Sequence, residues 1–251
     1  MGFPRICYDS RFKDAAPVAS STADGFDVLN LRDWRAHTWW QPISMPATVT
    51  VDCAEAKAAN YCAVWGHDLF SQGATLEVRA STDAFAASDV LIFSHDAQND
   101  DPFLLTWAVA SYRYWRARFT GALVPSVAIL AIGEALSFPK LTRAGFDPLG
   151  RETQKTVNVT VKGNPLGAVV DFRQWSQQIA FANLGKDWLR ANWMPAWRQH
   201  LETEPFIFAW DAESYFDEIV LGQIPDGKFS APHKVGPWVD LSFQVDGLVA
   251  S

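Results

Sequence analysis

The stretch of sequence that decides the fold is Tyr112-Arg113-Tyr114-Trp115-Arg116-Ala117-Arg118-Phe119-Thr120-Gly121. Bulky apolar residues alternate in it with charged residues, and a glycine ends it. Successive side chains of a β-strand point to opposite faces of a sheet, so this alternation predicts a strand with one buried face and one solvated face. The sequence around this stretch should therefore supply the rest of a sheet and its core.

Several shorter motifs precede this stretch in a definite order. They are Asn30-Leu31-Arg32-Asp33, Trp39-Trp40, and the strand-like runs at residues 48–52, 61–67 and 75–81. Taken in this order with the aromatic and arginine run that follows, they resemble the discoidin-like (galactose-binding-like) β-sandwich. The resemblance covers residues 25–133, and it implies a sandwich that binds ligands with loops at one end.

The composition fits a globular, mainly β chain of one large domain or two small ones. Of the 251 residues, 49% are hydrophobic and 20% are charged, which is enough apolar material for packed cores. The formal net charge of −7 provides no excess of basic side chains to neutralise phosphates, so we expect no nucleic-acid partner. No run of about 18 or more apolar residues occurs, and the first residues contain no signal-peptide core. We therefore expect no membrane span and synthesis into a cytoplasm.

Turn-forming and proline-containing segments divide the chain into four parts. Residues 1–26 show little periodicity and predict an extended N-terminal arm, with a short strand near residues 5–8. Residues 27–135 contain the runs of the discoidin-like sandwich, and the Pro- and Gly-punctuated segment 136–150 predicts a linker. Strand patterns then start again, so residues 151–251 predict a second β domain.

The second half opens with a hairpin pattern. Residues 153–161 alternate polar residues with Thr and Val, Gly163-Asn164-Pro165 is a turn signal, and residues 168–172 are apolar. Two runs of this kind on either side of a short turn predict two antiparallel strands.

A helical pattern follows the hairpin. Leu189, Trp193, Trp197 and Leu201 recur every four residues, which places them on one face of a helix over residues 186–202. Pro195 has no backbone N–H to donate, so it predicts a kink or the start of a second helix.

A second resemblance lies in this half of the chain. Its pieces are Ala131-Ile132-Gly133-Glu134-Ala135-Leu136, Gly145-Phe146-Asp147-Pro148, Trp188-Leu189-Arg190-Ala191-Asn192-Trp193-Met194-Pro195 and Pro205-Phe206-Ile207-Phe208-Ala209-Trp210-Asp211. They are similar to the C-terminal region of tail-tip (baseplate) proteins of long-tailed bacteriophages, including distal-tail and minor tail proteins. In those proteins a helix packs on a sandwich of the tail-tube type. This resemblance covers residues 129–249, and it implies that the second domain, residues 151–251, is of the tail-tube or distal-tail type.

Together the two resemblances imply a structural component of a phage tail tip, part of the ring or hub between the tail tube and the host-recognition apparatus. They imply tail tube, hub and fibre proteins as partners, further copies of the chain in a homo-oligomer or ring, and a location in the virion tail after assembly in the host cytoplasm. Such a role needs neither enzyme activity nor a cofactor, so we expect none. Two alternatives stay open: a carbohydrate-binding adhesin that contacts host-surface glycan, and a glycan hydrolase.

The candidate carbohydrate site lies at residues 35–41. Trp39 and Trp40 are adjacent, and adjacent residues of a strand point to opposite faces, so one indole should be exposed. Arg35, His37 and Gln41 would hydrogen-bond sugar hydroxyls while that indole stacks on a pyranose ring. The alternative is that both indoles pack in the core or against a neighbouring subunit.

The candidate for the hydrolase alternative is an acidic cluster. It contains Asp211, Glu213, Asp217 and Glu218, and paired carboxylates of this kind cleave glycosidic bonds when they face each other across a cleft. The cluster lies between two predicted strands, where such residues usually form a solvated turn. We therefore assign no catalytic residue.

Other reactive residue types occur without a motif. The five histidines form no HxH or HExxH pair, so we expect no metal site. The three cysteines, Cys7, Cys53 and Cys62, have no CxxC spacing, and we expect them to be reduced, buried thiols.

Overall fold

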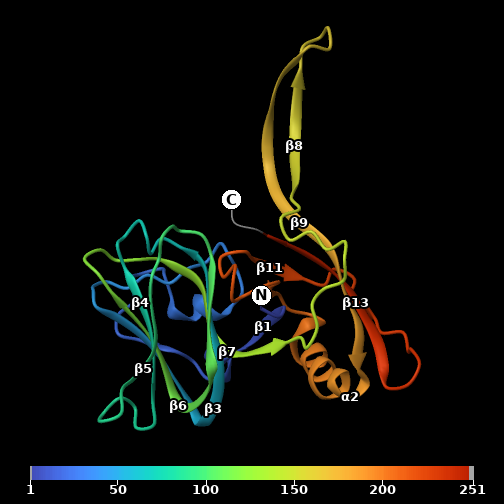
Figure 1. Cartoon of the computed structure of the whole chain (residues 1–251). Coiled ribbons are helices and arrows are strands. Elements are labelled where there is room, and N and C mark those ends of the chain that lie inside the picture. Colours follow the sequence, from blue (N-terminus) through green and yellow to red (C-terminus); the bar gives the residue numbers. More distant parts are fainter. Residues whose placement is uncertain (1, 249–251) are drawn as a thin grey trace. The chain divides into compact units, whose positions relative to one another are not determined.

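The protein is described by a computed structural model over residues 2–248, and it is mainly β, as the sequence predicts (Figure 1). The chain forms two compact units. Unit 1 comprises Met1–Ser137 and Ala209–Ile219, and unit 2 comprises Phe138–Phe208 and Val220–Ser251.

Unit 1 is an antiparallel β-sandwich. Its strands are β1 (Arg5–Ser10), β2 (Val18–Ala19), β3 (Ala47–His67), β4 (Thr75–Ser81), β5 (Val90–Asp96), β6 (Phe103–Thr120) and β7 (Val127–Ser137). They are hydrogen-bonded in the order β5-β4-β6-β3-β7-β1, and β2 pairs with β3. One short helix, α1 (Arg11–Asp14), and a 3₁₀ turn at Val28–Arg32 complete the described elements of residues 2–137.

The two long strands β3 and β6 run through both layers of the sandwich. Residues 47–52 of β3 pair with residues 114–119 of β6, and residues 61–64 of β3 pair with residues 103–106 of β6. The register shifts between these two regions, and Ala54 there has a φ of 63°. Such bulges bend a strand, so β3 and β6 fold over and their two parts lie in different layers.

The alternation in the deciding stretch is confirmed. Trp115, Ala117 and Phe119 of β6 are fully buried, while Arg116 and Arg118 between them are partly exposed. The buried residues join one hydrophobic core with side chains of β3, β4 and β7. A strand with one apolar face is stable because that face packs against the second layer.

The short strand predicted near residues 5–8 is confirmed as β1, but its place in an extended arm is wrong. β1 pairs with β7, with Ile6 opposite Leu136, and Ile6 and Cys7 are fully buried. Residues 5–10 are therefore a strand of the sandwich rather than an extended arm.

The predicted linker is also wrong at its start. Phe138 is buried in unit 2, where its ring lies on that of Phe181 with centroids 4.0 Å apart and planes inclined at 7°. Trp193 and Phe243 pack around the same ring. The chain therefore enters the core of unit 2 immediately after β7.

Unit 2 combines a β-sheet with one helical segment. Its strands are β8 (Glu152–Val159), β9 (Pro165–Gly185), β10 (Phe206–Ala209), β11 (Ile219–Gln223), β12 (Phe229–Ser230) and β13 (Trp238–Leu248). β13 pairs with both β9 and β11, β8 pairs with the first half of β9, and β12 pairs with β13. The second half of β9 is thus part of a sheet, whereas its first half belongs to a hairpin.

The helical segment follows β9 directly and runs from Lys186 to Leu201. It consists of α2 (Lys186–Trp188), α3 (Met194–Ala196) and π-helical turns at Leu189–Trp193 and Trp197–Leu201. Trp193, Trp197 and Leu201 are buried and Leu189 is partly buried, which confirms the predicted apolar face. Pro195 lies in the first turn of α3 and the helix continues beyond it.

Candidate functional site

The loop that contains the predicted carbohydrate site is held by its own polar side chains. The carboxylate of Asp33 accepts hydrogen bonds from the Arg35 backbone N–H at 2.9 Å and from the Thr38 hydroxyl at 2.8 Å. The side-chain amide of Asn30 donates to the backbone carbonyl of Trp39 at 2.9 Å. These bonds fix the backbone on both sides of His37, so the exposed side chains of this loop extend from a backbone that is held in place.

Trp39 is an exposed aromatic platform on this loop. About 40% of its surface is exposed, and Phe26 stacks on its ring with centroids 5.6 Å apart. Arg35 and His37 are exposed as well, so every second residue of the segment faces solvent. The loop thus offers one stacking surface and two side chains that can donate hydrogen bonds.

Trp40 does not belong to this exposed surface, and its assignment to the predicted site is wrong. It is fully buried, its indole N–H donates to the Thr22 hydroxyl at 3.3 Å, and its ring packs on Phe119. Its backbone forms a bridge with Val127 of β7. A buried indole cannot stack on a sugar.

Gln41 is partly buried beside Trp40. Its backbone carbonyl accepts a hydrogen bond from Ala23 N–H at 2.8 Å. Of the five predicted residues, the structure thus leaves Arg35, His37 and Trp39 on one exposed loop.

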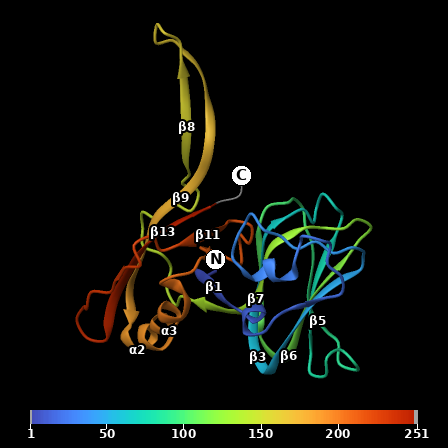
Figure 2. The same cartoon turned by 180° about the vertical axis from the view of Figure 1, so that it is seen from behind.

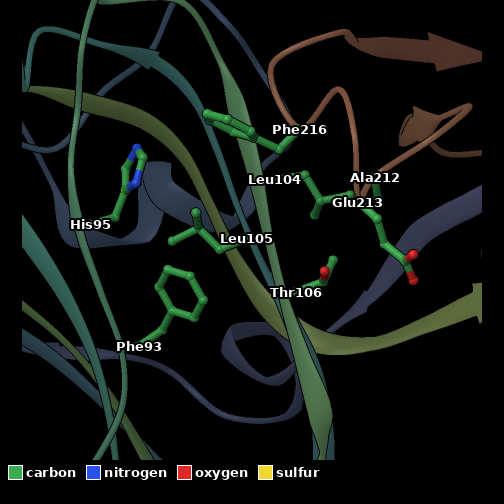
Figure 3. Close-up of a pocket in the computed structure, with 8 residues that line it drawn as sticks. All are labelled: Phe93, His95, Leu104, Leu105, Thr106, Ala212, Glu213 and Phe216. Carbon is green, nitrogen blue, oxygen red and sulfur yellow. The ribbon is translucent and has the colours of Figure 1, made fainter. Parts of the chain in front are cut away.

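A pocket of about 310 Å³ lies elsewhere in unit 1, and sequence reasoning missed it (Figure 3). It is lined by Phe93, His95, Leu104, Leu105, Thr106, Ala212, Glu213 and Phe216. The first two residues come from β5, the next three from β6 and the rest from the segment Ala209–Ile219. No local motif predicts such a pocket, because its walls come from segments that are distant in the sequence.

The segment Ala209–Ile219 is held in unit 1 by hydrogen bonds from backbone N–H groups. The backbone N–H of Leu104 donates to the carbonyl of Phe216 at 2.8 Å, and the Gly2 N–H donates to the Asp211 carboxylate at 2.7 Å. Phe216 also packs edge-on against His95. The pocket is therefore closed on one side by a segment that follows most of unit 2 in the sequence.

The pocket is apolar in its centre and acidic at its rim. Burial lowers the pKa of His95, so its imidazole is neutral at pH 7, and its ring lies 4.5 Å from that of Phe103. Glu213 lies across the pocket from Phe93 and His95 (Figure 3), and more than half of its side chain is exposed. Asp217 lines a smaller hollow beside the same His95. Such a surface suits an apolar group that is accompanied by a cation.

The acidic cluster is used in local structure. Asp211 is almost fully buried and accepts hydrogen bonds from the backbone N–H groups of Gly2 and Ser214. Glu218 accepts a hydrogen bond from the indole N–H of Trp210 at 2.9 Å, and Glu213 lies 3.5 Å from Arg5. These contacts show that the carboxylates stabilise a turn within unit 1.

The three cysteines have packing roles. Cys7, Cys53 and Cys62 are free and buried, and burial raises the pKa of the Cys53 thiol to about 11. Within residues 2–248, no cluster of three or more His, Cys, Asp or Glu side chains is arranged to hold a metal ion. The same part of the chain has no helix long and apolar enough to cross a membrane.

Comparisons with known proteins give a likeness of chain path over about half of this chain. No family model and no curated protein matches it. The resemblance to bacteriophage tail-tip proteins therefore stays a prediction. Among solved structures, chitosan-binding module 1 of a chitosanase/glucanase from Paenibacillus sp. IK-5 is similar at 13% identity and a TM-score of 0.42, over 49% of this chain and 97% of that one.

Two further structures show the same extent of likeness. The family 32 carbohydrate-binding module of C. perfringens NanJ, in complex with galactose, matches at 14% identity and a TM-score of 0.43, over 51% of this chain and 98% of that one. The corresponding module of AlyQ, in complex with 4,5-unsaturated mannuronic acid, matches at 23% identity and a TM-score of 0.40, over 50% and 96%. These values describe a likeness of chain path alone.

Proposed function

We propose that unit 1 binds carbohydrate through the loop that presents Trp39. The observation that supports the proposal is the exposed indole, which stacks on Phe26, with the exposed residues Arg35 and His37 on the same loop. The C–H groups on one face of a pyranose pack on an aromatic ring, and its hydroxyl oxygens accept hydrogen bonds from nearby donors. One indole and two donors on an open loop suit weak binding, with a dissociation constant of about 1 mM or roughly −4 kcal/mol.

The test is a glycan array followed by titration of the whole chain with each saccharide that binds. We expect Trp39→Ala to abolish binding and Trp39→Phe to retain part of it, because phenylalanine keeps a stacking surface. Trp238→Ala is the matched control, since Trp238 is exposed to a similar extent, 43%, but lies in unit 2. A blank array, or equal binding by Trp39→Ala and wild type, would reject the proposal.

A second candidate function is a structural subunit of a phage tail tip, in contact with tail tube, hub or fibre proteins in the virion. The observation that favours it is the hairpin of β8 and β9 in unit 2, in which every residue of β8 is exposed. Isolated two-stranded hairpins are marginally stable in water, so a long exposed hairpin suits a surface that a partner covers. Electron microscopy of purified particles, with an antibody against the chain, tests this role. Absence of the label from the tail tip would reject it.

A further inference from the structure

The hairpin of unit 2, residues 151–173, is called the arm below. β8 pairs there with the first half of β9, and the hairpin extends away from β11 and β13 of its own unit (Figures 1 and 2). All eight residues of β8 are exposed, as are the described side chains of residues 165–171. Neither face of the arm is therefore buried within unit 2.

The two faces of strand β8 differ in character. Val157 and Val159 share one face with Val170, because the register places Val170 opposite Lys155, two residues before Val157. These valines are 53%, 57% and 49% exposed. On the other face, Thr156 and Asn158 of β8 are polar, whereas Val169 of β9, opposite Thr156, is apolar and 58% exposed. A strand with one apolar face and one polar face is typical of a sheet that is covered on one side.

Basic side chains accompany the apolar face. Lys155 lies on the same side of β8 as Val157, and Arg173 is opposite Thr153 on that side. The arm as a whole has four basic and two acidic side chains, a net charge of +2. Its apolar face thus suits a surface that is apolar and acidic.

Unit 1 has the complementary charge. It contains 10 basic and 19 acidic side chains, a net charge of −9, whereas the rest of unit 2 has seven of each and is neutral. Two copies of unit 1 would repel each other, and so would two arms, but an arm and a unit 1 attract. Charge therefore favours contact between the arm of one copy and unit 1 of another.

One place on unit 1 matches the arm in both respects. The pocket beside Phe216 is apolar and has a volume of about 310 Å³, and Glu213 and Asp217 lie at or beside it. Phe216 is itself 39% exposed. A valine-bearing face flanked by Lys155 and Arg173 would bury apolar surface there and set its cations beside the two carboxylates.

We propose that the arm is a docking element whose apolar face covers the pocket of unit 1 in a second copy of this chain. The contact is head-to-tail, because different surfaces of the two copies meet, and such contacts generate rings or open filaments. The inference is independent of carbohydrate binding at Trp39. A ring of copies in a phage tail tip would be its biological context, so the inference rests on the second candidate function for that context alone. The two can fail separately, because self-association is measured on the purified chain and presence in the tail is measured on particles.

The first experiment measures the mass of the purified whole chain by light scattering and native mass spectrometry over a range of concentrations. We expect oligomers that dissociate as salt is raised, because exposed charges are screened. The double variant Val157→Ser, Val159→Ser should weaken association at least tenfold. The control Thr156→Ser, Asn158→Ser alters the other face and should associate as wild type does. A chain that stays monomeric at 100 µM and low salt would overturn the proposal, and so would equal association by both double variants.

The second experiment exchanges charges between the two surfaces. Lys155→Glu with Arg173→Glu should weaken self-association, and Glu213→Lys with Asp217→Lys should do the same. Mixing the two variants should restore association, because the acidic arm of one then meets the basic rim of the other. Circular dichroism checks that each variant is folded. Failure of the mixture to associate, with both variants folded and each dissociated alone, would place the arm on another surface and reject this docking site.

Discussion

The ring of Phe26 stacks on the indole of Trp39, with ring centroids 5.6 Å apart and planes inclined at 26°. A side chain that is held before its ligand arrives loses less entropy on binding. We therefore expect Phe26→Ala to weaken saccharide binding by about 1 kcal/mol, or roughly fivefold. Fluorescence titration of the whole chain measures the effect. Phe26→Tyr retains the stack and should bind as wild type does, and equal binding by Phe26→Ala would show that the stack is not used.

The two adjacent tryptophans should differ sharply in their effect on stability. Trp40 is fully buried against Phe119, so Trp40→Ala should destabilise the chain by about 3–5 kcal/mol. Trp39→Ala removes an exposed ring and should cost less than about 1 kcal/mol. Urea unfolding followed by circular dichroism gives both values. Similar losses in the two variants would mean that Trp39 is also a core residue.

The helical segment should depend on its tryptophans. Trp193 is fully buried between Trp197 and Phe243, with ring centroids 6.0 and 4.8 Å away. We expect Trp193→Ala to destabilise unit 2 by about 3–5 kcal/mol. Trp238→Ala, at an exposed position of the same unit, is the control and should change stability little. Thermal unfolding that does not distinguish the two variants would contradict the packing of Trp193 between Trp197 and Phe243.

The free energy of unfolding should depend on pH through Asp211. Burial opposes its charge, but hydrogen bonds from the backbone N–H groups of Gly2 and Ser214 outweigh this effect and lower the pKa of Asp211. In the unfolded chain the pKa is about 3.9, so the stabilisation is complete above that pH and is lost as pH falls through the lower folded value. Asp211→Asn should therefore be less stable at pH 7, and its difference from wild type should shrink towards acid pH. A difference that stays constant across this range in the measured unfolding free energy would exclude this role.

We also expect no glycan hydrolysis by the chain. Glu218 accepts a hydrogen bond from the Trp210 indole and Glu213 lies beside Arg5, so these carboxylates stabilise the turn. Assays for released reducing ends on cell-wall material should give a blank for wild type, Glu213→Gln and Glu218→Gln alike. Cleavage by wild type that either variant abolishes would restore the hydrolase alternative.

Patterns with a short period could be predicted from the sequence. The alternation around Trp115 and the four-residue spacing of Trp193 and Trp197 each follow from the geometry of one element, and burial matches both. Trp39 and Trp40 show the limit of such patterns. The alternation predicts that one of the two indoles is exposed, but it does not say which one, and the bridge between Trp40 and Val127 decides that Trp40 is buried.

Features that join distant segments could not be predicted in this way. The pocket needs β5, β6 and Phe216, and nothing near Phe216 in the sequence signals that its carbonyl accepts a bond from Leu104. The burial of Phe138 is similar, since its neighbours Pro139 and Lys140 are typical of a linker while its partner Phe181 lies far along the chain.

The segment Ala209–Ile219 leaves unit 2 after β10, completes unit 1 and returns to unit 2 at β11. During translation, unit 1 therefore stays incomplete until residues 138–208 and the segment after them have been synthesised. Until then the backbone N–H of Leu104 lacks its acceptor, the carbonyl of Phe216. A cut between residues 138 and 150 would leave two further covalent connections between the units. The two units are thus synthesised in an interleaved order, and cleavage of a single peptide bond cannot separate them.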